Sequence, residues 1–198
     1  MARRTLSYIE YVPSPGEIYR DIINSPGWPY KRDREFYLKR DRAFVAILYL
    51  LGLRVSEALR LKREQFIFPG EEGGRPDAIV VRAIKLSKSR FRNKPRKVQY
   101  RDGYLPLQGE RAPLTQLVVE YLKLVDSGRL FQFKTRQRAW QIVTAMTPYT
   151  CHWFRAFCED YLYDRWNRDI MAVADYIKVD VRTLQEYIRK RYARYEVV

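Results

Sequence analysis

The chain has 198 residues, 46% of them hydrophobic, and a formal net charge of +15. This length and hydrophobic content suffice for one domain with a substantial core, and the charge favours a polyanionic partner, with nucleic acid as the first candidate. The longest apolar stretch, FVAILYLLGL, is too short to cross a bilayer, so we expect no membrane partner. No apolar run follows the basic start, so we expect no signal peptide and a location in the cytoplasm or nucleoid.

The contents of cysteine and histidine argue against a metal centre. The two cysteines, Cys151 and Cys158, are separated by seven positions in a predicted helix, too far along its axis for easy bridging. We therefore expect free thiols, as is usual inside cells. With one histidine and no acidic cluster, we predict no metal site and no cofactor.

The first part of the chain predicts a leader followed by two helices. Residues 1–13 are expected to form the leader, and residues 14–198 the domain. Ser14 is a plausible cap for a short helix that ends near NSPGWP. Apolar residues then recur at helical spacing over 34–51, which predicts a long helix that Gly52 terminates.

An arginine follows this helix stop at once. Arg54 lies between Leu53 and Val55, and Ser56 is the expected cap of the next, shorter helix, SEALRLKREQF. The apolar neighbours predict that the joint is drawn inward. A buried arginine needs an anion, so Arg54 is a candidate anion ligand.

The remainder predicts a small sheet and then helices. Residues 79–88 and 96–107 are rich in β-branched and aromatic residues and predict an antiparallel hairpin, with a basic tip at 89–95. The predicted helices cover 113–125, 135–146, 150–166, 168–177 and 180–195, the last capped by Asp180. The expected fold class is mainly α with a small antiparallel β-sheet (α+β).

The predicted helix over 150–166 carries a His-x-x-Arg pair. His152 and Arg155 lie at positions i and i+3, hence on the same side, which we expect to face away from the stripe that contains Phe154 and Phe157. Taken alone, the pair is most simply explained as part of a solvated polar face.

The order of these features resembles the tyrosine recombinase (phage integrase) family, whose catalytic domain is related to type IB topoisomerases. The resemblance rests on GLRVSE at 52–57, a basic hairpin, His-x-x-Arg and a late tyrosine, and covers roughly residues 14–192. It implies the family's catalytic-domain fold and double-stranded DNA as partner. It further implies strand cutting and rejoining through a covalent 3′-phosphotyrosine, without metal or cofactor, and a possible homo-tetramer on DNA. An archaeal or viral-type integrase, or one from a mobile element, fits this description.

The resemblance also assigns roles to residues. Two guanidinium groups clamp the scissile phosphate, an imidazole accepts the nucleophile's proton, and a hairpin lysine protonates the leaving 5′-oxygen. The matching positions are Arg54, Arg155, His152, Lys88 with Lys85 in reserve, and the nucleophile Tyr187.

One position departs from the family pattern, and the choice of tyrosine has rivals. Where relatives carry a histidine or tryptophan about nine residues before the nucleophile, this chain has Lys178, which can still donate to a phosphate oxygen. Tyr187 is chosen by its register with Arg155, Lys178 and Thr183, and Tyr192 is its nearest rival.

Further basic residues are expected to follow the DNA backbone, where they give affinity and salt sensitivity rather than sequence choice. They are Lys85, Arg90, Arg92, Lys94 and Arg189. For the last, a charge bias at a helix C-terminus is the simpler explanation.

Alternatives stay open at this point. Relatives usually carry a separate helical core-binding domain before the catalytic one, and we expect none here, so the chain is either an isolated catalytic domain or a minimal enzyme. A non-catalytic DNA-binding protein of the same fold and a topoisomerase-like nicking-closing enzyme are the main rivals. A basic RNA-binding protein fits the charge but not the setting of Arg54.

Overall fold

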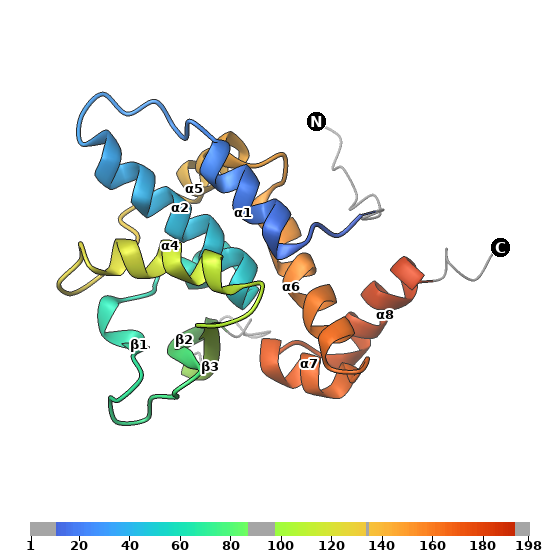
Figure 1. The fold of residues 1–198 in the computed structure, drawn as a ribbon. Helices are drawn as coiled ribbons and strands as arrows, with labels where there is room; N and C mark the ends of the chain where they lie inside the picture. Colours follow the sequence, from blue (N-terminus) through green and yellow to red (C-terminus); the bar gives the residue numbers. More distant parts are fainter. Residues whose placement is uncertain (1–10, 87–97, 134, 193–198) are drawn as a thin grey trace, which may run out of the picture.

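The computed structural model describes residues 11–86, 98–133 and 135–192, and the fold in this part is mainly helical with one small sheet (Figure 1). The predicted α+β class is confirmed. The elements are α1 (Pro15–Asn24), α2 (Arg34–Leu51), α3 (Val55–Ala58), a 3₁₀ turn (Arg63–Gln65), β1 (Phe66–Ile67), β2 (Ala78–Leu86), β3 (Val98–Pro106), α4 (Ala112–Leu122), α5 (Arg136–Met146), α6 (Cys151–Arg165), α7 (Ile170–Ile177) and α8 (Val181–Tyr192).

Helix α2 is the centre of the fold. It contacts α1, α4, α5, α6 and β3, and every residue from Ala43 to Leu51 is buried. A helix that is apolar on all sides is stable only when other elements surround it, which explains the unbroken run of hydrophobic letters. The helix ends at Gly52, whose φ of 58° lies in the left-handed region that glycine enters cheaply.

The sheet is antiparallel, with the strand order β1-β2-β3. The register pairs Val80 with Tyr104 and Lys85 with Gln99, so β2 and β3 form the predicted hairpin. Figure 1 shows this sheet beneath α2 and α4. The predicted basic tip lies outside the described residues, as does most of the predicted leader.

A second, smaller core attaches the last two helices to α6. Cys158 of α6, Ile177 of α7 and two residues of α8, Leu184 and Ile188, are buried together. In Figure 1, α7 and α8 lie together beside one end of α6. Asp180 caps α8 as predicted, because its Oδ1 accepts from the backbone N–H of Arg182 at 3.0 Å.

The predicted helix SEALRLKREQF is mostly wrong. Helix α3 is a single turn that begins at Val55, and its N-cap is Arg54 rather than Ser56. The chain then turns to pair with a distant loop: Arg63 N–H donates to Gly128 O, and Leu130 N–H to Leu61 O, each at 2.9 Å. These tertiary hydrogen bonds outweigh the helical propensity of the segment and lead it into β1.

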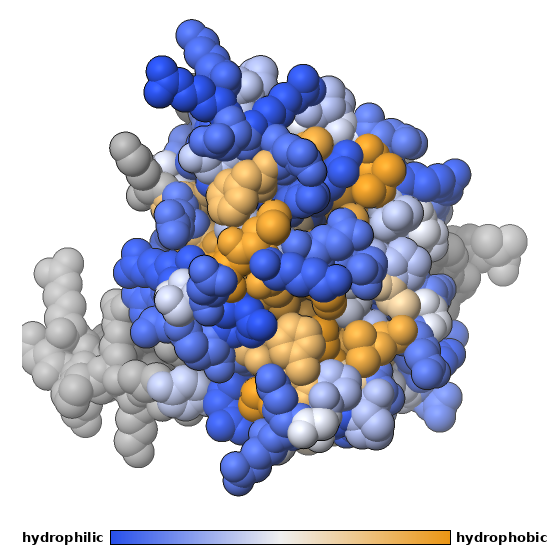
Figure 2. Space-filling view, turned by 60° about the vertical axis from the view of Figure 1, so that its left-hand side comes forward, coloured by the Kyte–Doolittle hydropathy of each residue, from blue (hydrophilic) through white to orange (hydrophobic). Residues whose placement is uncertain are grey.

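Both cysteines are free, as predicted, and both are buried. Within the described residues, no helix is both long enough and apolar enough to span a membrane. Figure 2 shows one face, around the start of α2 and the end of α4, where hydrophobic areas are broken up by hydrophilic side chains.

The joint after α2 yields a stability prediction. Gly52→Ala places a methyl group at positive φ and 3.0 Å from Cys158 Cβ, so we expect a loss of about 1–3 kcal/mol in the free energy of unfolding, measured by urea denaturation. Gly16→Ala is the control, because Gly16 lies in α1 with open space around it. The control should be neutral or slightly stabilising. Equal effects of both substitutions would contradict the role assigned to Gly52.

Candidate active site

A cavity of about 600 Å³ lies where the α2–α3 joint, α5, α6 and the segment leading into α8 meet. It brings together three of the predicted site residues, Arg54, His152 and Arg155. The rest of its lining is Leu53, Val55, Ser56, Arg136, Trp140, Thr150, Cys151, Ala156, Glu159, Val179, Thr183 and Leu184.

Arg155 is the buried cation of this site. It is only 8% exposed, although the sequence predicted that it lies on the polar side of its helix. The cause is the end of α2: Arg155 Nη1 donates to the carbonyl of Gly52 at 3.1 Å, which draws the side chain inward. Its Nη2 is buried and has no hydrogen-bond partner among the described residues.

Glu57 connects the two arginines. Its Oε1 lies 3.3 Å from Arg54 Nη1, and its Oε2 lies 4.0 Å from Arg155 Nη1. The same carboxylate accepts from the backbone N–H of Arg54 at 2.9 Å, so the first turn of α3 fixes its position. With a 3% exposed side chain, Glu57 holds both guanidinium groups against one wall of the cavity.

Arg54 itself is not buried, which corrects the expectation that the joint draws it inward. Leu53 is buried, but the side chain of Arg54 is 43% exposed. It is the N-cap of α3 and lines the cavity with a side chain that solvent reaches.

The electrostatic setting of His152 favours a neutral imidazole. Although His152 is an exposed residue, partial desolvation lowers the pKa of its ring below the usual 6.5, and the charges of Arg155 and then Arg54 lower the pKa further. A neutral ring has one nitrogen free to accept a proton. Burial and the two cations therefore keep the ring of His152 neutral.

Glu159 is the ion-pair partner of Arg155 within α6 and also lines the cavity. Its Oε1 lies 3.0 Å from Arg155 Nε, one helical turn along α6. Burial raises the pKa of this carboxyl to about 7, against the opposing effect of Arg155. Burial therefore weakens the negative charge that this carboxyl sets against Arg155.

Of the residues predicted near the end of the chain, some lie at the cavity and others do not. Lys178 is the left-handed C-cap of α7, and its Nζ lies 2.6 Å from Asp175 Oδ1 rather than in the cavity lining. Thr183 does line the cavity, and Tyr187 follows it by one turn in α8. The backbone of Arg189 also belongs to α8.

The predicted hairpin residues remain predictions. Lys88, Arg90, Arg92 and Lys94 lie outside the described residues. The backbone of Lys85 belongs to β2, in register with Gln99.

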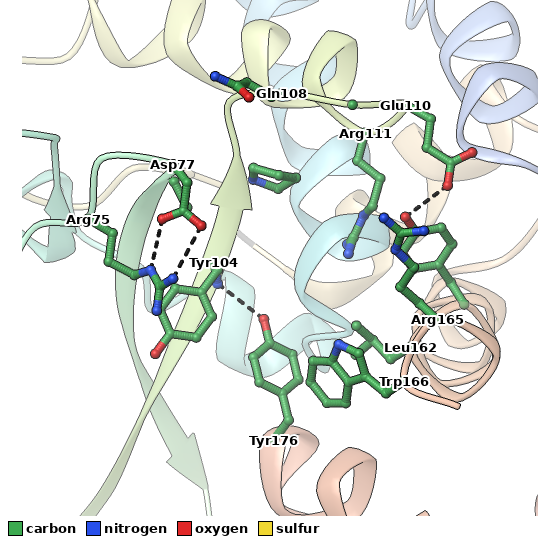
Figure 3. Close-up of a pocket in the computed structure, with 14 residues that line it drawn as sticks. Arg75, Asp77, Tyr104, Gln108, Glu110, Arg111, Leu162, Arg165, Trp166 and Tyr176 are labelled. Carbon is green, nitrogen blue, oxygen red and sulfur yellow. Dashed lines mark hydrogen bonds and ion pairs between the residues drawn. The ribbon is translucent and has the colours of Figure 1, made fainter. Parts of the chain in front are cut away.

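A second cavity, of about 550 Å³, has a structural explanation (Figure 3). Several of its charged groups have partners within the protein: Arg75 contacts Asp77, and Glu110 accepts from Tyr161. At its base, Tyr176 of α7 accepts from the backbone N–H of Tyr104 in β3 at 3.1 Å. This cavity marks the place where α7 docks on the sheet.

Comparison with known proteins confirms the fold. No protein-family model matches the sequence, and no curated protein matches it. Solved structures do match. One is the XerH site-specific recombinase bound to its difH substrate before cleavage, with a TM-score of 0.59, 17% identity, and coverage of 94% of this chain and 52% of that one. Another is XerH bound to a palindromic difH substrate after cleavage, with a TM-score of 0.57, 17% identity, and coverage of 87% of this chain and 46% of that one.

The fold is that of a tyrosine recombinase catalytic domain. The chain spans about half the length of the recombinase chains that it matches. The predicted fold class and family-like architecture are thereby confirmed, whereas the roles of individual residues are not tested by this likeness.

Sequence reasoning did not select several charged and aromatic residues in or next to the cavity of Arg54, His152 and Arg155. Glu57 lies behind the two arginines and Glu159 in the lining, where they contact the guanidinium groups, and Arg136 and Trp140 line the cavity from α5. The spacing held a signal for the carboxylates, since each lies three or four residues after an arginine. No local pattern distinguishes the α5 pair, because the fold alone brings α5 to the cavity.

The single histidine makes the cavity's electrostatics measurable. We expect the pKa of His152, followed by NMR titration of its ring protons, to lie below 6.5, and Arg54→Met to raise it. Because the folded state disfavours the charged ring, unfolding takes up a proton, and stability should fall as the pH drops through 6.5 toward the folded-state pKa. Arg60→Met, which removes an exposed charge outside the cavity lining, is the control and should leave the pKa nearly unchanged. A wild-type pKa at or above 6.5 would refute this description.

Proposed function

We propose that this chain cuts and rejoins DNA strands through a covalent 3′-phosphotyrosine, as the catalytic part of a site-specific recombinase or integrase. One observation carries the proposal: Arg54 and Arg155, from distant elements, share the carboxylate of Glu57 beside His152 in one cavity. The buried, unpartnered Nη2 of Arg155 offers a donor to an anion that enters the cavity.

The arrangement suits a phosphodiester in its transition state. Attack on phosphorus concentrates negative charge on the non-bridging oxygens, and donors fixed in advance stabilise that charge most effectively. Guanidinium groups are permanently charged and offer paired donors to two oxygens. Arg155 supplies the buried contact, and Arg54 supplies a second contact from the cavity mouth.

In the proposed reaction the phenol oxygen of Tyr187 forms a bond to phosphorus, and the bond from phosphorus to the 5′-oxygen breaks. The phenol proton passes to the neutral ring of His152, and the leaving 5′-oxygen takes a proton from Lys88. The products are a 3′-phosphotyrosine and a 5′-hydroxyl. Because the phosphodiester becomes a phosphotyrosyl ester, the reverse attack by a 5′-hydroxyl reseals the strand.

Double-stranded DNA is the proposed partner. The net charge of +15 and the cationic cavity support it, and the matched XerH structures are complexes with a difH substrate. Assembly of a homo-tetramer on DNA, integration of viral or mobile elements and a location in the cytoplasm or nucleoid extend the same proposal. The contacts expected of Arg90, Arg92, Lys94, Lys85 and Arg189 would serve it by following the backbone.

The covalent step is tested with a nicked suicide duplex that traps the adduct. We expect a DNA–protein adduct on a denaturing gel with the wild-type chain, loss of the adduct in Tyr187→Phe and retention in Tyr192→Phe. Arg155→Gln should slow adduct formation by about 10²–10³-fold, the usual cost of removing one such donor.

The other outcomes are equally informative. Loss in Tyr192→Phe alone would move the nucleophile to Tyr192. A wild-type chain that binds duplex DNA without forming an adduct would favour the non-catalytic DNA-binding alternative. Adduct formation with relaxation of supercoiled DNA, and no recombination, would favour the topoisomerase-like alternative.

The role of Lys178 needs its own test because its ammonium group is held by Asp175. If Lys178 reaches the phosphate during the reaction, Lys178→Met should slow adduct formation by about tenfold or more. Asp175→Asn, which releases the lysine without removing it, should leave the rate unchanged or raise it. Equal rates for Lys178→Met and the wild-type chain would remove Lys178 from the proposed site.

A further inference from the structure

We propose that Trp140 and Arg136 of α5 form a nucleotide-holding surface at the rim of the cavity. In this arrangement the indole of Trp140 packs against the deoxyribose next to the bound phosphate, and Arg136 contacts a neighbouring phosphate. The inference rests on the proposed function in one respect, namely that DNA occupies the cavity.

The sequence of α5 separates an inner and an outer face. Ala139, Ile142, Val143 and Met146 are buried in the main core. Arg136 and Trp140 are spaced at i and i+4, hence on one common side of the helix, and both are exposed. Both also line the cavity that contains Arg54, His152 and Arg155. Packing of the inner face therefore fixes the direction in which the outer pair points.

Trp140 differs from the other tryptophans of the chain. Trp28 lies under the guanidinium of Arg138 at 4.0 Å, and Trp153 and Trp166 pack against Phe157 and Tyr176. Trp140 is 44% exposed and, among the described residues, has no aromatic or cation–π partner of the kind that the other three have. A large aromatic surface is therefore left unused beside a group of cations.

The chemistry of these neighbours selects the ligand. Arg54, Arg155 and Arg136 attract phosphate, but Trp140 offers a flat, uncharged face that a phosphate does not use. A nucleotide combines both features, because its uncharged deoxyribose lies beside its phosphate. The deoxyribose is the same in every nucleotide of DNA, so a contact with it carries no sequence information. Trp140 should therefore contribute affinity and position rather than choice of site.

Arg136 completes the surface with a charge. In the part of the chain that the structure describes, it forms no ion pair with a carboxylate, so its guanidinium is available to a phosphate oxygen. At one helical turn from Trp140, it would contact the backbone a short way along the strand. The pair thus combines one apolar and one ionic contact. The salt dependence of DNA affinity distinguishes them, because only the ionic contact contributes to it.

The test is binding of a fluorescently labelled duplex by anisotropy at several salt concentrations. We expect Trp140→Ala to weaken binding about tenfold with an unchanged slope of log affinity against log salt, because no phosphate contact is lost. Arg136→Gln should instead reduce the magnitude of the slope by about one. Leu124→Ala is the matched control, since Leu124 is 45% exposed and lies outside the cavity lining.

A second measurement keeps the result independent of folding. Duplex DNA should quench the intrinsic fluorescence of the wild-type chain, and Trp140→Phe, which preserves a ring, should remove most of that quenching. Wild-type affinity in Trp140→Ala, or undiminished quenching in Trp140→Phe, would overturn the inference.

These readouts are separate from catalysis. If the wild-type chain forms no adduct but Trp140→Ala weakens binding as expected, the nucleotide-holding surface stands and the proposed reaction fails. If the adduct forms and Trp140→Ala binds DNA like the wild-type chain, the proposed reaction stands and the nucleotide-holding surface fails.

Discussion

The carboxyl end of α2 is the point on which the rest of the structure depends. Three successive carbonyls there accept from three buried arginines that come from different elements: Leu50 O from Arg111, Leu51 O from Arg101 of β3, and Gly52 O from Arg155 of α6. The last carbonyls of a helix lack partners within it and carry partial negative charge, so cations are stabilised there. One helix end thereby joins the sheet, the start of α4 and α6 in a single polar cluster within the core.

This cluster explains how the guanidinium group of Arg155 can be buried while one of its nitrogens has no partner. Arg155 gains from Gly52 O, Glu57 and Glu159, but none of these contacts uses its Nη2. Full neutralisation by two ionised carboxylates would make the site indifferent to a phosphate. Because burial raises the pKa of Glu159, its carboxylate opposes the charge of Arg155 less strongly than an exposed carboxylate would. The cation is thus stable enough to be buried and still attractive to an anion.

The sequence predicts most of the helices and the hairpin because their signals are local. The apolar run before Gly52, Asp180 as a cap and the β-branched strands all specify their own elements. It fails where distant contacts decide: the chain after Ala58 pairs with Gly128 and Leu130 instead of continuing a helix. The same reason explains why Arg155 is buried and Arg54 is not, the opposite of what the sequence predicted. Only the packed end of α2 determines which arginine is drawn inward. The sequence did not predict that Arg136 and Trp140 line the cavity, because only the packing of α5 in the folded chain places them there.

The same electrostatics link ligand entry to proton positions. In the proposed complex, a phosphate held at Nη2 of Arg155 would bring negative charge toward Glu159 and raise the pKa of its carboxyl further. A more protonated Glu159 would compete less with the phosphate for the guanidinium. The phosphate would also offset the two cations that lower the pKa of His152, so the imidazole would become a stronger base as the ligand arrives. In the proposed reaction, the same negative charge therefore accounts for both binding and activation of the base.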